Sequence, residues 1–493
     1  MIVTLAFILR LTPGLSTLLF TYDQARDAFF AQSITKGHLK IVGPPSDIPG
    51  FFHGPLFYYV ISPFYFLGSG DPQVVLIEMI LINLLVLIPL WQLTQKLFKN
   101  TSISIVALIL YAVSFEAVSY ARWISNPSLA VPAIAFFYLG LWQIVHKQKG
   151  GWVMTFLALG LAIQTQIFLV YLILSALVTL AIANVRYFPR KEMLLGASGF
   201  LFLISSFAVA ELKFKFQGIK GAADFFAGNI GAKTALDTQL MEYLKKWQEQ
   251  LSNNLFPQSG PISVILGLAI ISFAIYLAKT DKKIRKPLLF LLILLFANIP
   301  IFIVSSFSSY YITLGSLIPL LVLTAYFLHR VSLFSKYAFV LIIGAIILTN
   351  SLTVFEKNQK GSVLFRIQDG MIFKDEMALV KKTYEISPVQ RFSINAVTNP
   401  LYIPTTWAYL YQLYAKQNNL LLPHFHGNTA STFPGIEVFP RSGEITKTEF
   451  TIIEPSLDRQ WPHWIQKTTE EDNLRKPISY EVNIGHFQLL VRE

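Results

Sequence analysis

Long apolar runs separated by short basic loops dominate this sequence and constrain its fold more than any other feature. Apolar residues make up 54% of the 493 positions and charged residues only 14%, a composition too apolar for a soluble protein of this length. An α-helix needs about 20 mostly apolar residues to cross a bilayer, and we therefore expect a polytopic α-helical membrane protein with about 11 transmembrane helices. The predicted spans are 1–19, 73–95, 102–120, 128–146, 152–166, 168–185, 193–211, 261–279, 287–305, 311–328 and 336–351.

Lysine and arginine gather in every second connection between these runs. Cytoplasmic loops of membrane proteins carry an excess of both residues, so the alternation predicts a plasma-membrane protein with a cytoplasmic N-terminus and an external C-terminal segment. These loops also account for much of the net charge of +12, which argues against a nucleic-acid-binding surface. The basic loops are 96–99, 146–149, 186–191, 279–286 and 329–336.

The composition changes after the last apolar run. Residues 352–493 have an ordinary charge density, alternating apolar patterns at 450–454 and 486–492, and a helical stretch at 375–384. This segment is long enough to bury its own hydrophobic core. We therefore expect a membrane domain over 1–351 and a small external α+β domain over 352–493.

Two features of the C-terminal segment have alternative interpretations. The aromatic stretch 398–414 suits a sugar-facing or membrane-facing surface, but a second helix packed in the domain core is favoured. His424 and His426 flank Phe425, and two histidines at this spacing would bind a metal only with a further ligand nearby. The chain contains no cysteine, so thiolate ligands and disulfides are excluded. We interpret the two histidines as a loop pair.

The first long segment between apolar runs, residues 20–72, carries acidic side chains close to a membrane boundary. Thr21 and Gln24 have the spacing of a capping box, which predicts that a helix begins at Thr21. Asp23 would then lie in the first turn, where the helix dipole favours an ionised carboxylate, and Asp27 would share its face one turn on. The alternative is a solvated loop whose acidic residues only cap a helix.

The second half of this loop passes through a Pro/Gly-rich stretch to His53, Gly54 and Pro55. The following aromatic residues 56–67 are too few to cross a bilayer, and their tyrosines suit the membrane interface. We expect a helix lying in the plane of the membrane. A true span here would invert the alternation of the basic loops.

The first loop also resembles that of a known family. Asp23-Gln-Ala, Lys36-Gly37 and His53-Gly-Pro-Leu-Phe-Tyr-Tyr are similar to the first external loop of GT-C glycosyltransferases of the protein O-mannosyltransferase and aminoarabinose-transferase group (glycosyltransferase family 39-like). The family usually has Glu where this chain has Gln24, and Pro where it has Gly54. Both departures argue against a role for position 24 as a second carboxylate or as a metal ligand.

The resemblance implies an enzyme that moves a sugar from a polyprenyl-phosphate donor to a hydroxyl or phosphate acceptor at the external face of the bilayer, with inversion. The acceptor would be a protein, a lipid or an envelope glycan. Asp23 falls on the family's catalytic aspartate and would act as general base, supported by Asp27. The resemblance also implies that Tyr22, His53 and Tyr58 shape the turn of this loop or contact the substrate. Some relatives use a divalent cation, and no ligand cluster in this sequence requires one.

Basic residues at the predicted outer membrane edge are candidates for binding the donor phosphate. Arg122 resembles the family's Ala-Arg, with Asn126 in place of an acidic residue; its guanidinium suits phosphate, although it could instead snorkel to headgroups. Glu116 lies in the outer end of the third span, where a carboxylate is expected to pair with Arg122 or to face a cavity. The other phosphate candidates, each alternatively a simple headgroup anchor, are Lys213, Lys215 and Lys220.

Two other classes of protein fit part of this evidence. A membrane transporter would show an inverted repeat and charges near the bilayer midplane, and neither is evident in the sequence. A non-catalytic component of polysaccharide assembly would need no catalytic carboxylate. A nucleotide-sugar donor is disfavoured because no P-loop or G-x-G-x-x-G fingerprint occurs in a βαβ context.

Overall fold

A computed structural model gives the fold, and the chain divides into two compact units, each of which is described by itself. Unit 1 comprises Met1–Thr12, Lys40–Phe57 and Met79–Phe355. Unit 2 comprises Pro13–Leu39, Tyr58–Glu78 and Glu356–Glu493. The structure describes every residue except 49, 227–235, 306–309, 363, 365–367, 389–390, 431, 442–444 and 456.

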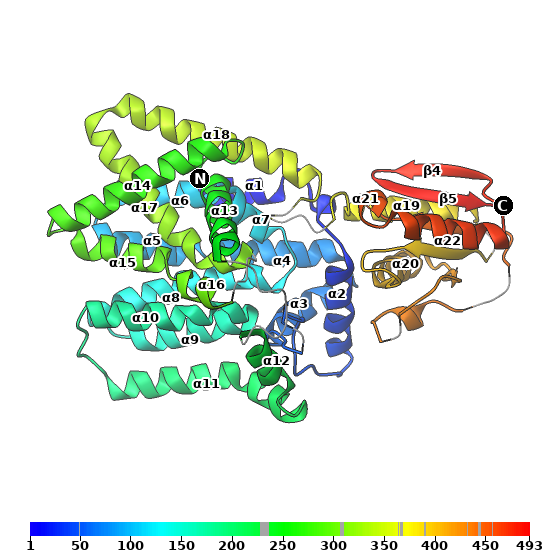
Figure 1. Ribbon diagram of the computed structural model, residues 1–493, viewed down its shortest axis with the longest axis horizontal. Helices are drawn as coiled ribbons and strands as arrows, with labels where there is room; N and C mark the ends of the chain where they lie inside the picture. The colour runs from blue at the N-terminus through cyan, green and yellow to red at the C-terminus, as the bar shows by residue number, and fades with distance from the viewer. Residues whose placement is uncertain are drawn as a thin grey trace. The chain divides into compact units, whose positions relative to one another are not determined.

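Unit 1 is helical, and its long helices lie roughly side by side (Figure 1). Helix α8 packs on α9, which packs on α11, and α6 packs on α1, α5 and α17. The helix α4, Pro72–Leu84, is divided between the two units, and the start of α3, Leu56–Leu67, and the end of α18 also cross the division. The other helices of unit 1 are α1 Ile2–Leu11, α5 Leu87–Phe98, α6 Thr101–Val113, α7 Phe115–Ala121, α8 Asn126–Val145, α9 Gly151–Thr165, η2 Ile167–Val170, α10 Tyr171–Ile182, α11 Arg190–Lys213, α12 Gln217–Phe226, α13 Leu236–Asn254, α14 Gly260–Thr280, α15 Arg285–Leu295, α16 Ile299–Ser305, η3 Tyr310–Ser316, α17 Leu317–Phe334 and α18 Lys336–Gln359.

In the described part of the chain, 7 helical stretches are long and apolar enough to cross a membrane, or 8 if the pair α6 and α7, bent by 58°, is one span. Each of these corresponds to a predicted span. The three other predicted spans correspond to shorter apolar helices: α1, α9 and the stretch formed by η2 and α10. Helix α1 is shorter than predicted because Pro13 follows it, and Thr12 therefore takes an extended conformation.

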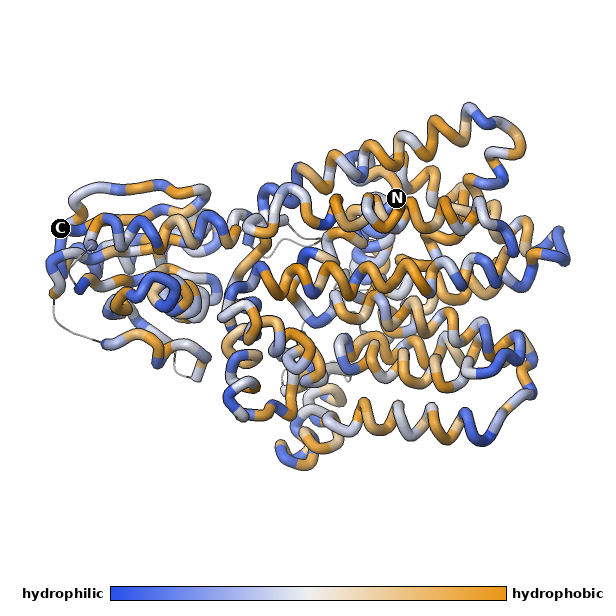
Figure 2. The backbone as a smooth tube through the Cα atoms, turned by 180° about the vertical axis from the view of Figure 1, so that it is seen from behind, coloured by the Kyte–Doolittle hydropathy of each residue, from blue (hydrophilic) through white to orange (hydrophobic). Residues whose placement is uncertain are grey.

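Contacts join several basic loops at one end of unit 1. Lys96 Nζ donates to Gln148 Oε1 over 2.6 Å, and Asn100 Nδ2 lies 3.2 Å from His329 Nε2. Figure 2 shows hydrophilic residues at the ends of helices whose middle parts are apolar. This arrangement is what the alternation of basic loops requires, while the side of the membrane on which this end lies stays a prediction.

The helix predicted to begin at Thr21 is present in unit 2 as α2, Tyr22–Thr35. Thr21 is its N-cap, and the Gln24 side chain accepts a hydrogen bond from the Thr21 backbone N–H over 3.0 Å, which completes the predicted capping box. The Gln24 side chain therefore caps the N-terminus of α2. The helix predicted over 56–67 is α3, Leu56–Leu67, and its Ser62 Oγ donates to the Ala31 carbonyl oxygen of α2 over 2.9 Å.

The C-terminal part of unit 2 is an α+β fold built on a five-stranded sheet in the order β2-β1-β3-β5-β4. Strands β2, β1 and β3 run parallel, whereas β5 pairs antiparallel with β3 and β4. The predicted fold class, a polytopic helical protein with a small C-terminal α+β domain, is confirmed. The elements of this C-terminal part are α19 Phe373–Ile386, β1 Ser393–Val397, α20 Thr405–Asn418, β2 His424–Phe425, η4 Ile436–Val438, β3 Glu449–Ile453, α21 Leu457–Gln460, α22 Pro462–Arg475, β4 Tyr480–Ile484 and β5 Phe487–Arg492. The N-terminal stretch of unit 2 also contains η1 Leu15–Thr17.

The aromatic stretch 398–414 forms part of the core of this fold, as favoured from the sequence. Trp407 of α20 is fully buried, and its ring centroid lies 5.6 Å from that of Phe487 on β5. The Trp407 indole N–H also donates to Glu454 Oε1 over 3.0 Å. Burial of the indole with its donor satisfied explains why this position suits tryptophan.

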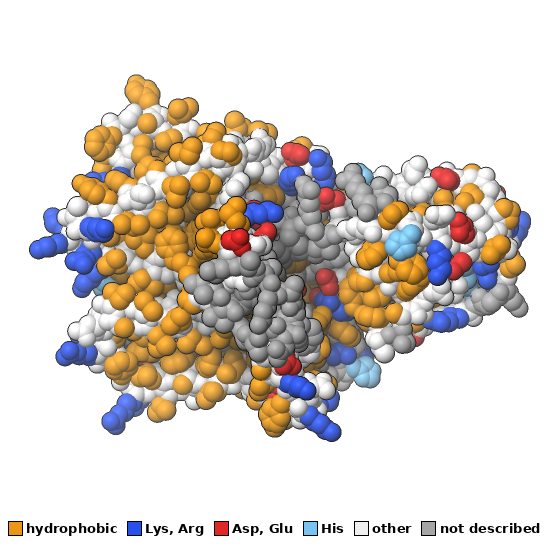
Figure 3. Space-filling view, in the orientation of Figure 1, with side chains coloured by type: hydrophobic (Ala, Val, Ile, Leu, Met, Phe, Trp, Pro, Cys, Tyr) orange, Lys and Arg blue, Asp and Glu red, His pale blue; other side chains and the backbone are white. Residues whose placement is uncertain are grey.

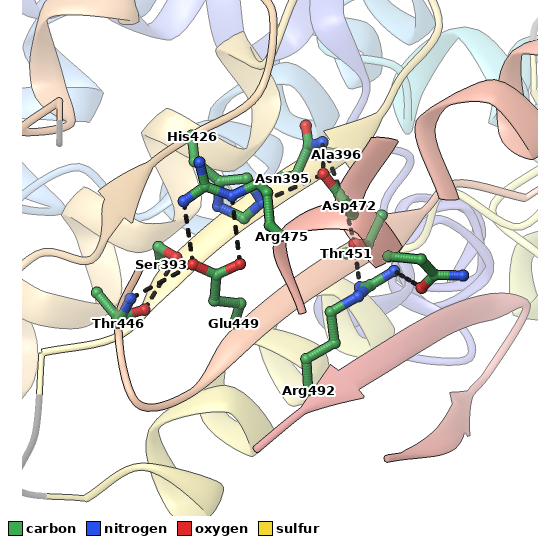
Figure 4. A network of polar contacts seen from close by, with 11 residues as sticks. Ser393, Asn395, Ala396, His426, Thr446, Glu449, Thr451, Asp472, Arg475 and Arg492 are labelled. Carbon is green, nitrogen blue, oxygen red and sulfur yellow. Dashed lines mark hydrogen bonds and ion pairs between the residues drawn. The ribbon is translucent and has the colours of Figure 1, made fainter. Parts of the chain in front are cut away.

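The opposite face of the sheet carries a buried polar network (Figure 4). Asp472 of α22 accepts a hydrogen bond from Asn395 Nδ2 over 3.0 Å and another from the Thr451 hydroxyl, and His426 Nε2 lies 3.4 Å from its carboxylate. Burial opposes ionisation of Asp472, but these hydrogen bonds outweigh it and lower its pKa.

The prediction that His424 and His426 form a loop pair is wrong in part, because His424 belongs to strand β2.

Candidate functional site

The two acidic residues of α2 converge on one arginine. Arg26 Nη1 lies 2.7 Å from Asp23 Oδ1, and Arg26 Nη2 and Nε each lie 2.8 Å from Asp27 Oδ1. Arg26 was not singled out from the sequence. Its spacing of three residues from Asp23, which places oppositely charged side chains side by side on a helix, is the signal that could have identified it.

The two carboxylates differ sharply in exposure. The Asp23 side chain is 44% exposed, whereas that of Asp27 is only 2% exposed. Burial raises the pKa of Asp27 to about 7, although its ion pair with Arg26 opposes the shift. A single guanidinium cannot fully compensate two carboxylates, so the buried one is the easier to protonate. Asp23 is therefore the carboxylate of the pair that is open to the surroundings.

Two predicted tyrosines complete this cluster. The Arg26 guanidinium lies 5.4 Å from the centroid of the Tyr22 ring, a cation–π distance. Tyr58 of α3 is 1% exposed, and its hydroxyl lies within the electrostatic influence of Asp27 and Arg26. Burial raises the pKa of both tyrosines, so both stay neutral. Unit 2 thus brings together four of the predicted site residues around Arg26.

A cavity of about 530 Å³ lies in unit 2 at the C-terminal end of α2. The Tyr65 side chain is 1% exposed, and its hydroxyl has no hydrogen-bond partner among the described residues. Gln32 Nε2 donates to Tyr409 Oη over 2.9 Å, and Tyr409 Oη donates to the Gly70 carbonyl oxygen over 2.6 Å. The lining includes two lysines and no acidic residue among those described: Gln32, Thr35, Lys36, Tyr65, Phe66, Ser69, Gly70, Tyr409, Gln412, Leu413 and Lys416.

The remaining predicted site residues belong to unit 1. His53 is buried, and its Nδ1 accepts a hydrogen bond from the Ile167 backbone N–H over 3.3 Å. The next residue, Gly54, donates its N–H to the Gln164 carbonyl oxygen over 2.9 Å. A Cβ at position 54 would lie 1.8 Å from Gln164 Oε1. This close approach explains why the chain has glycine where the family usually has proline.

Glu116 lies at the bend between α6 and α7, where it is 2% exposed. Its carboxylate accepts a hydrogen bond from Asn254 Nδ2 of α13. Asn254 Oδ1 in turn accepts from the Ser114 hydroxyl over 2.7 Å, and Ser114 caps the N-terminus of α7. These contacts assign Glu116 to a buried network that fixes the bend and joins it to α13.

Arg122 and the three lysines differ in their surroundings. Arg122 is 4% exposed, and its Nη1 donates to the Arg10 carbonyl oxygen over 2.7 Å. Lys213, Lys215 and Lys220 are all exposed, at the end of α11, in the turn and on α12. Lys213 Nζ lies 5.9 Å from the centroid of the Phe214 ring. The lysines therefore present their charge to the surroundings, whereas Arg122 lies in the interior of unit 1.

The described residues hold no group of three or more His, Asp or Glu side chains that could bind a metal ion. No metal ligand is therefore assigned in the part of the chain that the structure describes. The site can be discussed from its carboxylates, its arginines and lysines, and its tyrosines.

Comparisons with known proteins agree with this architecture. Residues 52–209 match the family model described as dolichyl-phosphate-mannose-protein mannosyltransferase. The structure of ArnT from Cupriavidus metallidurans bound to undecaprenyl phosphate is similar, with a TM-score of 0.58, 11% identity, and coverage of 99% of this chain and 97% of ArnT. Apo ArnT gives a TM-score of 0.60 at the same identity and coverage. The fold is of the GT-C type. No sequence among the curated proteins matches the chain.

The GT-C fold extends over both units, while the family model covers a more limited stretch. Its range of 52–209 includes His53, Tyr58, Glu116 and Arg122. Asp23 precedes this range and the three lysines follow it. The resemblance stated from the first loop and the membrane helices is thus supported by the family model and, independently, by the GT-C fold.

Proposed function

We propose that this GT-C protein is an integral-membrane glycosyltransferase that uses a polyprenyl-phosphate-linked sugar. The support comes from the matched mannosyltransferase family model and from the similar ArnT structure, which holds undecaprenyl phosphate. The acceptor is a hydroxyl or phosphate group of a protein, lipid or envelope glycan at the external face. The observation that carries the proposal is the half-exposed Asp23 carboxylate fixed by Arg26 on a capped helix.

Asp23 is proposed to act as general base. Its Oδ1 is engaged by Arg26, so Oδ2 is the oxygen that would take the proton of the acceptor hydroxyl. The acceptor oxygen then attacks the anomeric carbon, and the bond between that carbon and the phosphate oxygen breaks with its electron pair leaving on the phosphate. Attack from the face opposite the leaving group inverts the configuration. Proton transfer of this kind contributes about 10²–10⁴-fold in rate.

The basic residues of unit 1 are proposed to stabilise the charge that develops on the leaving polyprenyl phosphate. The exposure of Lys213, Lys215 and Lys220 at the end of the candidate span α11 suits contact with a phosphate at headgroup level. Arg122 Nη1 donates to the Arg10 carbonyl oxygen, and the guanidinium group is proposed to stabilise the phosphate by its positive charge.

The cavity of unit 2 is proposed to hold a part of the acceptor that does not react. The tyrosine and glutamine side chains of its lining suit the many hydroxyl groups of a saccharide, and the Tyr65 hydroxyl has no partner among the described residues. Lys36 and Lys416 suit an anionic substituent. Helix geometry places residues 32–36 about 14–20 Å along α2 from Asp23. A monosaccharide cannot bridge this distance, so the acceptor is proposed to be an extended molecule.

The proposed function is tested by incubating the purified protein with a radiolabelled polyprenyl-phosphate sugar and an envelope extract. Transfer of label to one acceptor fraction that is lost in Asp23→Asn supports a glycosyltransferase. Movement of the intact donor across a proteoliposome membrane without transfer would instead support the transporter interpretation. Tyr65→Phe and Lys416→Ala should then raise the KM for acceptor while leaving the KM for donor unchanged.

A further inference from the structure

A second cavity lies within unit 1, far in sequence from the first loop. It has a volume of about 390 Å³ and opens between α8, α10 and α15. None of its residues takes part in the site described above. The lining consists of Trp142, Val145, His146, Thr179, Ile182, Ala183, Arg285, Lys286, Leu289, Phe290 and Ile293.

The polar part of this cavity is basic. Arg285 and Lys286 line it from the first turn of α15, and His146 lines it from the end of α8. No acidic residue is present among the described lining residues. Two cationic side chains around one cavity, without a carboxylate among the described residues of its wall, favour an anionic ligand. The His146 Nδ1 lies 3.1 Å from the Trp142 carbonyl oxygen, so Arg285 and Lys286 are the donors to such a ligand.

The other part of the cavity is apolar and includes two buried aromatic rings. Trp142 and Phe290 are each 3% exposed, and their ring centroids lie 5.0 Å apart. The Trp142 ring also lies 4.2 Å from the His146 ring, which positions the imidazole at the junction between the polar and apolar parts. Ile182 at the rim is 60% exposed, so the apolar part continues onto the outer face of α10.

The position of the cavity along the helices fits an amphiphilic ligand. It lies where α8 and α15 meet the basic loops 146–149 and 279–286, next to the C-terminal end of α10. Figure 3 shows lysine and arginine side chains bordering the apolar surface at that end of unit 1. A molecule bound here would have its anionic group at the predicted cytoplasmic headgroup level and its tail against membrane-facing helices.

We propose that this cavity binds the phosphate headgroup of a membrane lipid, with Arg285 and Lys286 holding the phosphate and the α10–α15 surface holding one chain. Basic pockets between transmembrane helices recognise anionic headgroups in this way. The site is separate from the proposed site of sugar transfer, and it would fix the spacing of α10 and α15 at the basic end.

The test uses native mass spectrometry of the detergent-purified full chain with lipids added at known concentrations. Dioleoyl phosphatidylglycerol is compared with dioleoyl phosphatidylcholine, which has the same tails and no net charge, and with undecaprenyl phosphate. The double variant Arg285→Ala/Lys286→Ala removes the cations of the wall. The matched control, Lys282→Ala/Lys283→Ala, removes the same charge from exposed residues of the adjoining loop that do not line the cavity.

The expected result is that one or both phosphate lipids bind more tightly than phosphatidylcholine, and that the double variant weakens this binding about tenfold or more, whereas the loop control changes it less than about threefold. The tighter of the two phosphate lipids identifies the source of the headgroup. Ala183→Trp, which fills the mouth and keeps every charge, should also prevent binding. Equal weakening in the loop control, equal binding of phosphatidylcholine, or full binding to Ala183→Trp with an unchanged melting temperature would each overturn the proposal.

Discussion

Arg26 Nη1 lies 2.7 Å from Asp23 Oδ1, one helical turn away on α2. The same guanidinium holds the buried Asp27, so one cation orients a carboxylate that a substrate can reach and another that it cannot. This arrangement gives the two acidic residues different exposures although they share one face of the helix. Asp23 is accessible for chemistry, and Asp27 helps to fix Arg26.

Asp23→Asn is expected to lower the rate of sugar transfer by about 10²–10⁴-fold, because asparagine keeps the size of the side chain but cannot take the proton. Asp27→Asn should cost much less, since this carboxylate is buried. The measurement is transfer from a purified lipid-linked donor, with folding of each variant checked by its melting temperature. Near-normal turnover in Asp23→Asn, together with loss of turnover in Asp27→Asn or Glu116→Gln, would reject the assignment of the base.

Arg26→Ala is expected to destabilise unit 2 by about 3–5 kcal/mol, because it leaves the buried Asp27 without its partner. Below its pKa of about 7, Asp27 can be protonated in the folded state, so the penalty should be smaller at pH 6 than at pH 8. The free energy of unfolding in denaturant is measured at both values. Adding Asp27→Asn to Arg26→Ala should recover part of the loss at pH 8, and a penalty independent of pH would contradict this account.

Glu376→Gln is expected to stabilise unit 2 at pH 8 and to have little effect at pH 5. Glu376 is fully buried, its carboxylate has no hydrogen-bond partner among the described residues, and burial raises its pKa well above 4.5. The unfolded chain ionises first as the pH rises through about 4.5, so stability is greatest below this value and falls as the pH rises towards the folded-state pKa.

The stabilisation by Glu376→Gln is measured as the shift in melting temperature at the two pH values. Each pKa unit corresponds to about 1.4 kcal/mol, and for a unit of this size each 1 kcal/mol shifts the melting temperature by about 2–4 °C. The control is Glu385→Gln on the same helix, α19, whose side chain is 48% exposed. Equal shifts at pH 5 and pH 8 would show that ionisation of Glu376 is not the cause.

Lys215→Ala and Arg122→Ala are expected to weaken use of the lipid-linked donor by about ten- to a hundredfold if each contacts the phosphate, since a charge-assisted hydrogen bond is worth roughly 1.5–3 kcal/mol. The measurement is the KM for donor at two salt concentrations. Lys283→Ala, at the basic end of unit 1, serves as the control. An unchanged KM in both variants would leave Lys215 as a headgroup anchor and Arg122 as a structural residue.

Tags inserted near Gln148 and Asp281 are expected to be cytoplasmic, and a tag after Glu493 external. The reason is the excess of lysine and arginine in every second connection. Protease protection in oriented vesicles measures the side of each tag. A cytoplasmic tag at Glu493 would place the C-terminal fold on the wrong side for the proposed reaction.

Much of the helical architecture could be predicted from the sequence because a bilayer demands long apolar helices and tolerates few alternatives. The capping box at Thr21 and Gln24 was also predictable, since it depends only on residues three positions apart. The first predicted span was too long because it was based on apolar composition alone. Pro13 disfavours a helical conformation at Thr12, and the helix therefore ends there.

The contacts of the site were less predictable because they join residues that are distant in the chain. Asn254, the partner of Glu116, lies 138 positions further on, and no local pattern indicates that pairing. Gln164, which leaves no space for a side chain at Gly54, is equally remote. Arg26 is the exception, because its spacing of three residues from Asp23 can be recognised in the sequence. That spacing does not indicate that the Arg26 side chain is buried.

Unit 2 is formed by three separate stretches of the chain, and this has a consequence for biosynthesis. Gln32 of α2 and Tyr409 of α20 are hydrogen-bonded although 377 positions separate them, and Tyr409 also stacks edge-on against Phe29 at 5.2 Å. The ribosome therefore delivers α2 long before the helix that covers it, and the intervening membrane helices are inserted first. Until synthesis reaches α20, the apolar face of α2 must be shielded by chaperones or by the membrane surface. A C-terminal fragment expressed from Glu356 onward would expose the complementary face of α20 and is expected to aggregate.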